Sequence, residues 1–512
     1  MALRDRAHLN TERFDTVDLT VLVAAVTYLA FGALLIVVFF TQITGSPDVI
    51  TGWRIAVLAL FVAVFAVGHR WIGADDHQHT VQFVLFLGGS LLLVEIIHGT
   101  SSPGIGFGWS RSLETIGVFL LLLFILVVYP DYRAFDRVQW LFIGLFSVVI
   151  GLMFFHTLAA SPEVLTSRWP IWACVVAAIN LLVIPRFIPE RVFLWTIAGL
   201  AGLASLAAIA VVAVGEYSLL FFEVQQSTNA QIPFTDTRYA ELRTGQSVFN
   251  NVNVFGLVAF AGVVSSVIVL ARSFTARQIH SAVAAAALLP VVLIGLALSM
   301  SEVAWIATGV CVGIYLGYLA FGRLAFPPLI VAAGLLVVGA ITAVYLGYIP
   351  VHDSNRFQLW RASIEALRAS PSVLGHGHVN TDQFIDPYLP ADVTRTPHNS
   401  YLSMFIRIGL LGGLAYVALI LGAIVYGTVA YRSVNVGMLV FTVGWAVHQL
   451  FESYTLIQWT IPAVLSTLAL GYLLFGHRGE PATQRSDART RDPLPTRIAT
   501  RLEQRVDHLR RD

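Results

Sequence analysis

The chain contains 512 residues, of which 57% are hydrophobic and 12% are charged, and its mean hydropathy is +0.76. Soluble globular proteins carry roughly twice this charged fraction, so the composition excludes a soluble globule and indicates a polytopic membrane protein. The formal net charge is +1, and the basic residues are scattered between apolar runs, so nothing in the sequence indicates a nucleic-acid-binding patch.

The first polar segment, residues 1–18, precedes a run of about 22 apolar residues. This run is too long for the core of a signal peptide, and no small-residue cleavage site follows it. We therefore expect residues 1–18 to form a cytoplasmic arm before the first membrane span. Residues 73–79, GADDHQH, carry side chains that could ligate a metal, but they lie in a predicted cytoplasmic loop away from every other polar motif.

Apolar runs that could cross roughly 30 Å of membrane hydrocarbon as helices follow one another along the chain. They begin near Leu19, Gly52, Thr80, Leu113, Val138, Pro170, Val192, Asn253, Gln278, Glu302, Ala325, Ile408, Val434 and Leu456. Both cysteines, Cys174 and Cys311, fall inside such runs, so neither a disulfide framework nor a thiolate metal site is expected. The predicted fold is an all-α membrane domain over residues 19–476, with about 14 transmembrane helices.

The distribution of the 31 basic residues, all of them arginines, predicts the orientation of the spans. When the odd-numbered spans run outward, most arginines fall on the side that holds both termini. Cytoplasmic loops accumulate positive residues, so we expect both termini in the cytoplasm and the protein in the cell (inner) membrane of a prokaryote. Residues 477–512 then form a partly disordered cytoplasmic tail, whose end is either a basic amphipathic helix on the inner leaflet or a solvated segment without a role.

Two predicted outer loops, residues 216–251 and 350–400, are far longer than the cytoplasmic loops. Long loops in compact proteins are usually functional or disordered. Most of the outer arginines lie in these two loops, although the positive-inside bias disfavours them there. We therefore expect a function that requires positive charge on the extracytoplasmic face, and we expect short helices in the loop between the eleventh and twelfth spans.

The end of the first long loop places Arg243, Asn251 and Asn253 where the eighth span begins. A helix N-terminus has N–H groups without helical partners and a partial positive charge, so it favours an anionic ligand, the more so beside an arginine. N-capping explains Asn251 and Asn253 equally well. Arg243 remains a candidate ligand of an anion.

The second long loop contains a stretch, residues 355–384, whose apolar spacing predicts an amphipathic helix along the outer surface. Arg356 and Arg361 lie near the start of this helix, with Trp360 between them. Arginines that face a cavity suit a pyrophosphate, because guanidinium binds phosphate oxygens in bidentate geometry. Solvent-facing charges on an interfacial helix are the alternative explanation.

The second loop ends at His398, which precedes Asn399 and Tyr401 and lies between Arg395 and Arg407. Imidazole is the side chain whose unperturbed pKa suits general base catalysis near neutral pH. A polar residue satisfied at the membrane interface is the alternative for a lone histidine. This alternative would be preferred for His398 alone, so the catalytic interpretation depends on the other segments of the chain.

Taken together, these three segments resemble the O-antigen ligase and O-antigen polymerase family, membrane glycosyltransferases that use polyprenyl-pyrophosphate-linked glycans. The resemblance lies in three patterns in a fixed order: Arg-x-x-Gly with Asn-x-Asn, Arg-x-x-x-Trp…Pro…Gly-x-Gly, and His-Asn-x-Tyr-Leu with a glycine pair. These patterns are met by Arg243, Gly245, Asn251, Asn253, Arg356, Trp360, Pro371, Gly375, Gly377, His398, Asn399, Tyr401, Leu402, Gly409 and Gly412. The motif-bearing part covers about residues 240–425.

The resemblance implies an inverting, metal-independent glycosyl transfer without a cofactor. An acceptor hydroxyl attacks the anomeric carbon of the donor sugar and polyprenyl pyrophosphate leaves, so the reaction needs a base and positive charge at the leaving group. The acceptor is a glycan, a lipid or a protein, which leaves ligase and polymerase open. His398 is the expected base, and the expected substrate-binding residues are Arg243, Arg356, Arg361, Arg395, Arg407, Asn251, Asn253, Trp360, Asn399 and Tyr401.

The chain departs from the family pattern at three positions. Family members often carry proline at the position of Val252, arginine at that of Glu302 and an acid at that of Arg407. Either Arg407 replaces the missing arginine, or the donor binds differently.

Other ionisable residues are functional candidates by default because they lie within or at the ends of spans, mostly where water is within reach. They are Glu95, His98, Glu302, His448 and Glu452. His376 and His378, on the same face as His398, could hold a metal.

The competing function is a transporter or a flippase of lipid-linked oligosaccharides. Such a protein predicts charges near the membrane midplane and two similar halves of the chain, whereas the polar residues here concentrate in one late loop.

Overall fold

The computed structural model describes residue 126 and residues 132–159, 169–219, 222–227, 230–231, 238–239, 243–249, 251–349, 355–377, 381–390, 397–458 and 460–476. The chain divides into two compact units, residues 1–91 with 218–223, and residues 92–217 with 224–512. The expected N-terminal arm, the first four expected spans, residues 73–79 and the expected tail at 477–512 lie outside the described residues. Apart from residues 218–219 and 222–223, the described residues belong to the second unit.

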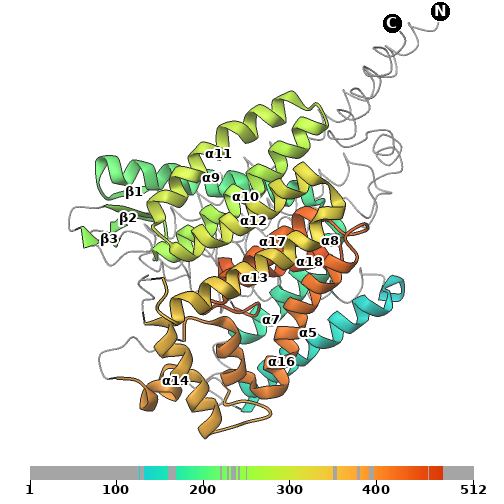
Figure 1. Ribbon diagram of the computed structural model, residues 1–512, viewed down its shortest axis with the longest axis vertical. Helices are drawn as coiled ribbons and strands as arrows, with labels where there is room; N and C mark the ends of the chain where they lie inside the picture. The colour runs from blue at the N-terminus through green and yellow to red at the C-terminus, as the bar shows by residue number, and fades with distance from the viewer. Residues whose placement is uncertain are drawn as a thin grey trace, which may run out of the picture. The chain divides into compact units, whose positions relative to one another are not determined.

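Each of the last ten predicted spans is an α-helix in the structure (Figure 1). These helices are α5 (Arg137–Ala159), α7 (Trp169–Leu182), α9 (Glu190–Val214), α10 (Val252–Thr275), α11 (Ile279–Ser299), α12 (Glu302–Phe321), α13 (Phe326–Tyr345), α16 (Ser400–Val429), α17 (Val436–Gln449) and α18 (Ile461–Leu474). Short pieces flank them: η2 (Tyr132–Ala134), α8 (Ile184–Phe187) and η3 (Arg323–Ala325). In the described part of the chain, seven helices are long and apolar enough to cross a membrane, whereas α7, α17 and α18 are shorter.

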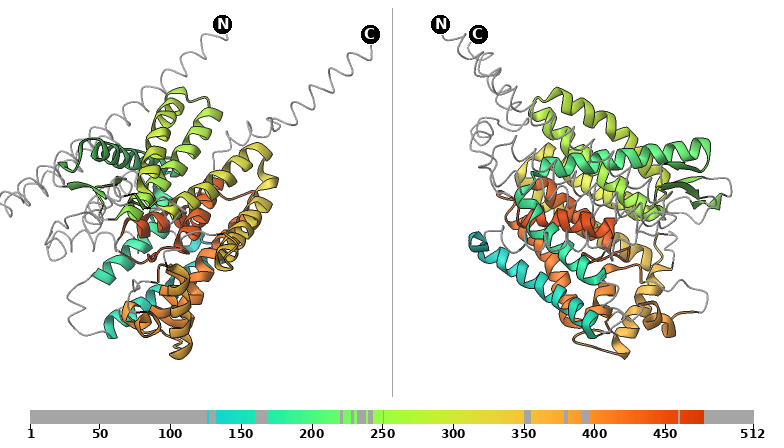
Figure 2. Two further views of the ribbon diagram at one scale, coloured as in Figure 1. Left: turned by 60° about the vertical axis from the view of Figure 1, so that its left-hand side comes forward. Right: turned by 180° about the vertical axis from the view of Figure 1, so that it is seen from behind.

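The protein is therefore a predominantly helical, multi-pass membrane protein, and the count of 14 spans stays a prediction. Helix α10 lies at the centre of the packing, because it contacts α9, α11 and α12 and most of its surface is buried. Helices α11 and α13 are mostly exposed along apolar surfaces, as expected for helices that face lipid. Figure 2 shows α5 alongside α16, with which it packs.

Small residues let the central helices approach closely, as is common between membrane helices. A Cβ atom added to Gly262 of α10 would lie 2.3 Å from the Cβ of Ala201 in α9. One added to Gly444 of α17 would lie 2.2 Å from the Sγ of Cys311 in α12. Cys311 is thus a buried packing residue, which agrees with the expectation that the cysteines form no disulfide.

The expectation of an all-α protein misses five short strands before α10. They are β1 (Tyr217–Leu219), β2 (Phe222–Ser227), β3 (Ala230–Gln231), β4 (Arg238–Tyr239) and β5 (Thr244–Ser247). Residues 225–227 of β2 pair antiparallel with β5, and β3 pairs antiparallel with β4. Strand β5 lies against α9, because Ser247 Oγ donates to the Ala204 carbonyl at 2.7 Å and a Cβ at Gly245 would lie 2.7 Å from the Cβ of Ala208.

The connection between α13 and α16 contains α14 (Arg356–Ala369), α15 (Thr381–Ile385) and η4 (Asp386–Tyr388). The predicted amphipathic helix is therefore present as α14. Its apolar face meets the first part of α16, as Figure 1 shows, through a cluster of Leu359, Ala366, Ile385 and Ile406. This packing fixes the start of α14 relative to the start of α16.

Helix α16 is broken at Gly409, whose φ is 70°. The loop at residues 372–377 crosses the break and supplies backbone partners on both sides of it. His376 N donates to Ile406 O and Gly377 N to Arg407 O, both at 2.9 Å, while Leu410 N and Leu411 N donate to Ser372 O and Val373 O, both at 3.0 Å. A break in a membrane helix leaves polar backbone groups without helical partners, and this loop satisfies them.

The close crossing requires two of the glycines in the motif. A Cβ at Gly375, where φ is 93°, would lie 2.3 Å from the Arg407 carbonyl oxygen. A Cβ at Gly409 would lie 2.2 Å from the Gly375 nitrogen. Both glycines therefore serve a backbone-to-backbone contact that ties the loop after α14 to α16.

Candidate functional site

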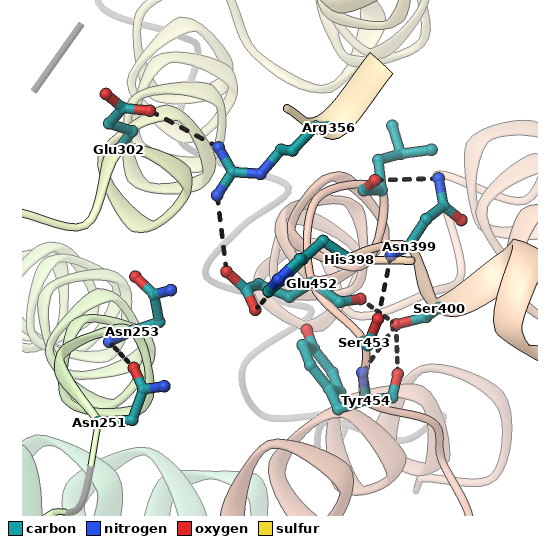
Figure 3. A network of polar contacts seen from close by, with 11 residues as sticks. Asn251, Asn253, Glu302, Arg356, His398, Asn399, Ser400, Glu452, Ser453 and Tyr454 are labelled. Carbon is teal, nitrogen blue, oxygen red and sulfur yellow. Dashed lines mark hydrogen bonds and ion pairs between the residues drawn. The ribbon is translucent and has the colours of Figure 1, made fainter. Parts of the chain in front are cut away.

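Four charged or titratable side chains from four segments form one chain of contacts (Figure 3). Arg356 Nη1 lies 3.6 Å from Glu302 Oε2, and Arg356 Nη2 lies 3.8 Å from Glu452 Oε1. His398 Nδ1 lies 3.8 Å from the other Glu452 oxygen, Oε2. These residues come from the start of α14, the start of α12, the segment after α17 and the residues before α16. We call them the outer cluster, after the outer face on which the sequence predicts their loops: Glu302, Arg356, His398 and Glu452.

Hydrogen bonds between two segments place His398 beside Glu452. Asn399 caps α16, because its Oδ1 accepts from Leu402 N at 3.0 Å, and its Nδ2 donates to Leu450 O at 3.0 Å. Asn399 N also donates to Ser453 Oγ at 3.2 Å. The sequence reasoning named Asn399 as a substrate ligand, whereas in the structure its side chain is used to hold the cluster together.

Ser400 completes this connection. Its Oγ donates to the Glu452 carbonyl at 2.6 Å and accepts from Tyr454 N at 3.1 Å. His398 itself has a φ of 45°, a left-handed backbone conformation that costs a non-glycine residue about 1–2 kcal/mol. The surrounding hydrogen bonds hold the backbone in this conformation.

The Arg356 guanidinium lies beside an aromatic pair. Its Cζ is 6.0 Å from the ring centre of Phe451, and the same ring lies 5.8 Å from the Trp360 ring. Arg356 and Trp360 are four residues apart on α14, so they project from the same side of the helix. Trp360 is half-buried next to the cluster.

Several polar atoms of the site are buried and have no hydrogen-bond partner in the described part of the chain. They are Arg356 Nε, Trp360 Nε1, His398 Nδ1, Glu452 Oε1 and the Tyr454 hydroxyl. The ion pairs are also longer, at 3.6–3.8 Å, than the roughly 2.7–2.9 Å of a charge-assisted hydrogen bond. Buried polar groups are rarely left unsatisfied, so this site has the capacity to bind polar groups of a ligand or water.

The electrostatics favour an ionised Glu452. Burial alone would raise the pKa of the Glu452 carboxyl, but His398, His448 and Arg356 outweigh burial and hold that pKa below its ordinary value. An anion beside Nδ1 stabilises a positive charge on the imidazole and orients the ring. The remaining ring nitrogen of His398, Nε2, is then the atom available to take a proton from a substrate.

Other candidates from the sequence lie outside the outer cluster. Arg361 is 78% exposed and forms a 3.0 Å ion pair with Glu365 on the surface of α14. Arg243 is exposed just before β5, and among the described residues no ion pair joins it to the cluster. Arg395 lies outside the described residues.

The structure describes four further candidates, all of them outside the cluster. Asn251 caps α10 by accepting from Asn253 N at 2.7 Å, the capping role noted as an alternative, and Figure 3 shows both asparagines to one side of the cluster. Tyr401 donates to the Ala446 carbonyl at 3.1 Å and so joins α16 to α17. Arg407 is half-buried next to the break in α16.

The sequence reasoning did not single out the two carboxylates. Glu302 and Glu452 were only two of several ionisable residues at span ends, and nothing local pairs either of them with Arg356. Their position at the ends of apolar helices was the available signal, because an ionisable residue there is a functional candidate.

Two histidines were considered as metal ligands. His376 contacts the Ser370 carbonyl at 3.0 Å through Nε2, and His378 lies outside the described residues. The described residues contain no group of three or more potential metal ligands.

Residues 284–417 match the family model described as O-antigen ligase. The matched segment contains Glu302, Arg356 and His398, and it ends before Glu452. No curated protein and no solved structure is a significant match to this chain. The match confirms the resemblance to the O-antigen ligase family; the second and third motifs lie within the matched segment, whereas the first, at residues 243–253, precedes it.

Proposed function

We propose that this chain, which carries an O-antigen ligase family domain at residues 284–417, transfers a glycan from a polyprenyl-pyrophosphate-linked donor to an acceptor hydroxyl at the outer face of the membrane. Glycan transfer of the O-antigen ligase type in the membrane is the activity that the family match implies. The donor, the face of the membrane and the residues assigned below belong to the proposal. The observation that carries it is the contact of His398 with Glu452, next to Arg356.

His398 is the proposed general base. As the acceptor oxygen forms a bond to the anomeric carbon, the bond from that carbon to the pyrophosphate oxygen breaks and takes its electron pair with it. The acceptor proton passes to Nε2 of His398, and the Glu452 carboxylate beside Nδ1 stabilises the resulting imidazolium. A single displacement of this kind inverts the anomeric configuration.

Arg356 is the proposed partner of the leaving pyrophosphate. Negative charge develops on the leaving oxygen, and a pre-placed guanidinium stabilises it most where water is largely excluded. Only 15% of the Arg356 side chain is exposed, and its Nε has no partner within the described chain. The guanidinium is proposed to take the role that a divalent cation has in other phosphoryl-linked transfers.

Trp360 is the proposed contact for the first sugar or the phosphate. Its indole N–H is buried without a hydrogen-bond acceptor, one helical turn from Arg356. Contacts with the rest of the donor or with the acceptor are proposed for the other candidates: Arg243, Arg361, Arg395, Arg407, Asn251, Asn253, Asn399 and Tyr401. The acceptor is a glycan, a lipid or a protein, so both ligase and polymerase activities fit the proposal.

Purified protein in liposomes tests this function directly. It is incubated with a lipid-pyrophosphate oligosaccharide and a panel of glycan, lipid and protein acceptors, with a chelator of divalent cations present. We expect a glycosylated acceptor of inverted anomeric configuration together with polyprenyl pyrophosphate. Movement of the lipid-linked oligosaccharide between leaflets without any product would instead favour the flippase.

A further inference from the structure

Arg356 lies between two carboxylates that differ in their connections. Glu452 contacts His398, and its segment is held by hydrogen bonds to Asn399 and Ser400. Glu302 is the first residue of α12 and approaches Arg356 from the opposite side to Glu452, as Figure 3 shows. The two carboxylates are similarly buried, with 16% of the Glu302 side chain and 14% of the Glu452 side chain exposed.

The charge balance of the cluster opposes an anionic donor. Glu302, Glu452 and Arg356 together carry one net negative charge, and a pyrophosphate adds more. Like charges within a few ångströms repel strongly where water is scarce. One carboxylate must therefore move away from Arg356 before a phosphate oxygen can take its place.

Glu302 is better placed to move than Glu452. Its carboxylate belongs to the first turn of α12, where the partial positive charge of the helix N-terminus favours an anion. The N-cap residue of that helix, Ser301, makes no side-chain capping bond, and its hydroxyl is buried without a partner. Movement of Glu302 would leave the contact between Glu452 and His398 in place, whereas movement of Glu452 would remove the partner of His398.

We propose that Glu302 is a built-in competitor of the donor pyrophosphate for Arg356. In the empty site its carboxylate occupies the Nη1 side of the guanidinium, and the donor displaces it. Glu302 then lowers donor affinity in the ground state and the transition state alike, so it sets the KM for the donor and leaves kcat unchanged. This inference rests on the proposed function.

Replacement of Glu302 by glutamine tests the inference, because it keeps the side-chain size and removes the charge. We expect Glu302→Gln to lower the donor KM by about 3-fold to 10-fold and to change kcat by less than about 2-fold. Glu365→Gln is the matched control, since it neutralises an exposed carboxylate of α14 outside the cluster, and we expect no change in either constant. An unchanged or higher donor KM in Glu302→Gln, or a large fall in kcat, would overturn the proposal.

Binding of a polyprenyl pyrophosphate without a glycan separates this inference from the proposed function. Its affinity for the full-length protein in detergent is measured by titration, and we expect Glu302→Gln to bind it more tightly than the unmodified chain. Absence of transfer with every acceptor would contradict the proposed function, but this binding comparison would still decide the role of Glu302. Glu302→Asp, which shortens the reach to Arg356, should show a smaller gain in the same direction. Failure of both variants to fold would assign Glu302 a structural role and overturn the proposal.

Discussion

Two clusters at opposite ends of α10 and α17 each place an arginine beside a glutamate, and they differ in how completely their polar atoms are bonded. In the first, which we call the clamp, Arg272 donates to Glu190 Oε2 and to Asn435 Oδ1, both at 3.0 Å, and Asn435 also donates to Glu190. In the outer cluster, Arg356 lies 3.6–3.8 Å from its two glutamates and its Nε has no partner within the described chain. The clamp joins α9, α10 and α17, whereas the outer cluster leaves donors and acceptors available.

The comparison indicates how a structural ion pair differs from a prepared site. Short hydrogen bonds engage both terminal nitrogens of Arg272 and fix the ends of three helices, and of the clamp's side-chain atoms only Glu190 Oε1 is buried without a partner among the described residues. In the outer cluster the contacts are long and several buried polar atoms have no hydrogen-bond partner in the described chain, so these atoms can bind a ligand. Variants of the outer cluster should therefore affect transfer, and variants of the clamp should affect stability.

Among the variants that compare the outer cluster with the clamp, the loss of the Glu452 charge should lower the transfer rate most. We expect Glu452→Gln to lower kcat by about 10-fold to 100-fold, a part of the 10²–10⁴ that a general base contributes. Steady-state rates at neutral pH measure this effect, and an unchanged kcat would exclude Glu452 as the partner of His398.

The lowered pKa of Glu452 also predicts how stability responds to pH. A carboxyl group whose folded pKa is depressed stabilises the fold above its unfolded pKa, about 4.3 for glutamate, and loses this effect only as the pH falls through the lower folded value. The Glu452 contribution to stability should thus be intact at pH 5. We expect no loss of Tm attributable to Glu452 between pH 7 and pH 5, which a comparison of the unmodified chain with Glu452→Gln measures.

Removal of the Arg356 guanidinium should chiefly weaken donor use. We expect Arg356→Ala to raise the donor KM about tenfold or more, because two carboxylates then face the pyrophosphate without a cation. Arg356→Lys should recover only part of the loss, since lysine keeps the charge without the bidentate fork. Arg368→Ala is the control, an exposed arginine in the last turn of the same helix. An unchanged donor KM in Arg356→Ala would contradict donor binding by Arg356 and favour the alternative that it is a charge on an interfacial helix.

Disruption of the clamp should produce a smaller effect of a different kind. The Arg272 side chain is 43% exposed, so water screens the pair, and we expect Arg272→Ala to lower the free energy of unfolding by about 1 kcal/mol. Activity per folded molecule should stay unchanged. Thermal unfolding in detergent, combined with the transfer assay, measures both quantities. Loss of kcat without loss of Tm would remove the distinction between the two clusters.

The smallest effect is expected at Arg361. Its guanidinium is exposed and bonded to Glu365 on the surface, so Arg361→Ala should change transfer by less than about 2-fold. A loss comparable to that of Arg356→Ala would show that the donor extends over the outer surface of α14.

The sequence predicted the described spans because each apolar run must satisfy its own backbone in lipid, which leaves helix as the available form. It predicted α14 from its apolar spacing, and it selected Arg356 and His398 from their chemistry. The position of Arg361 outside the cluster follows from helix geometry. Arg356 and Arg361 are five residues apart on α14 and therefore separated by about 140° around the helix axis, so they cannot both face one small cavity.

Other features depend on contacts between distant segments. Glu452 meets His398 through hydrogen bonds of Asn399 and Ser400 to residues 450–454, and no local pattern reports that pairing. The break at Gly409 is hidden because glycine is common in membrane helices, and its reason lies in the crossing with Gly375. The strands at 217–247 are only two to six residues long, so the alternation of apolar and polar residues in β1 and β2 is too brief to identify a strand from sequence.

The most direct test of the account is transfer by His398→Ala, with His280→Ala as the control because His280 is exposed at the start of α11. Product formation and binding of the lipid-pyrophosphate oligosaccharide are measured on the same purified samples. The account predicts that His398→Ala binds the donor but loses transfer by about 10²-fold to 10⁴-fold, while His280→Ala matches the unmodified chain. Transfer by His398→Ala at the unmodified rate would contradict the account.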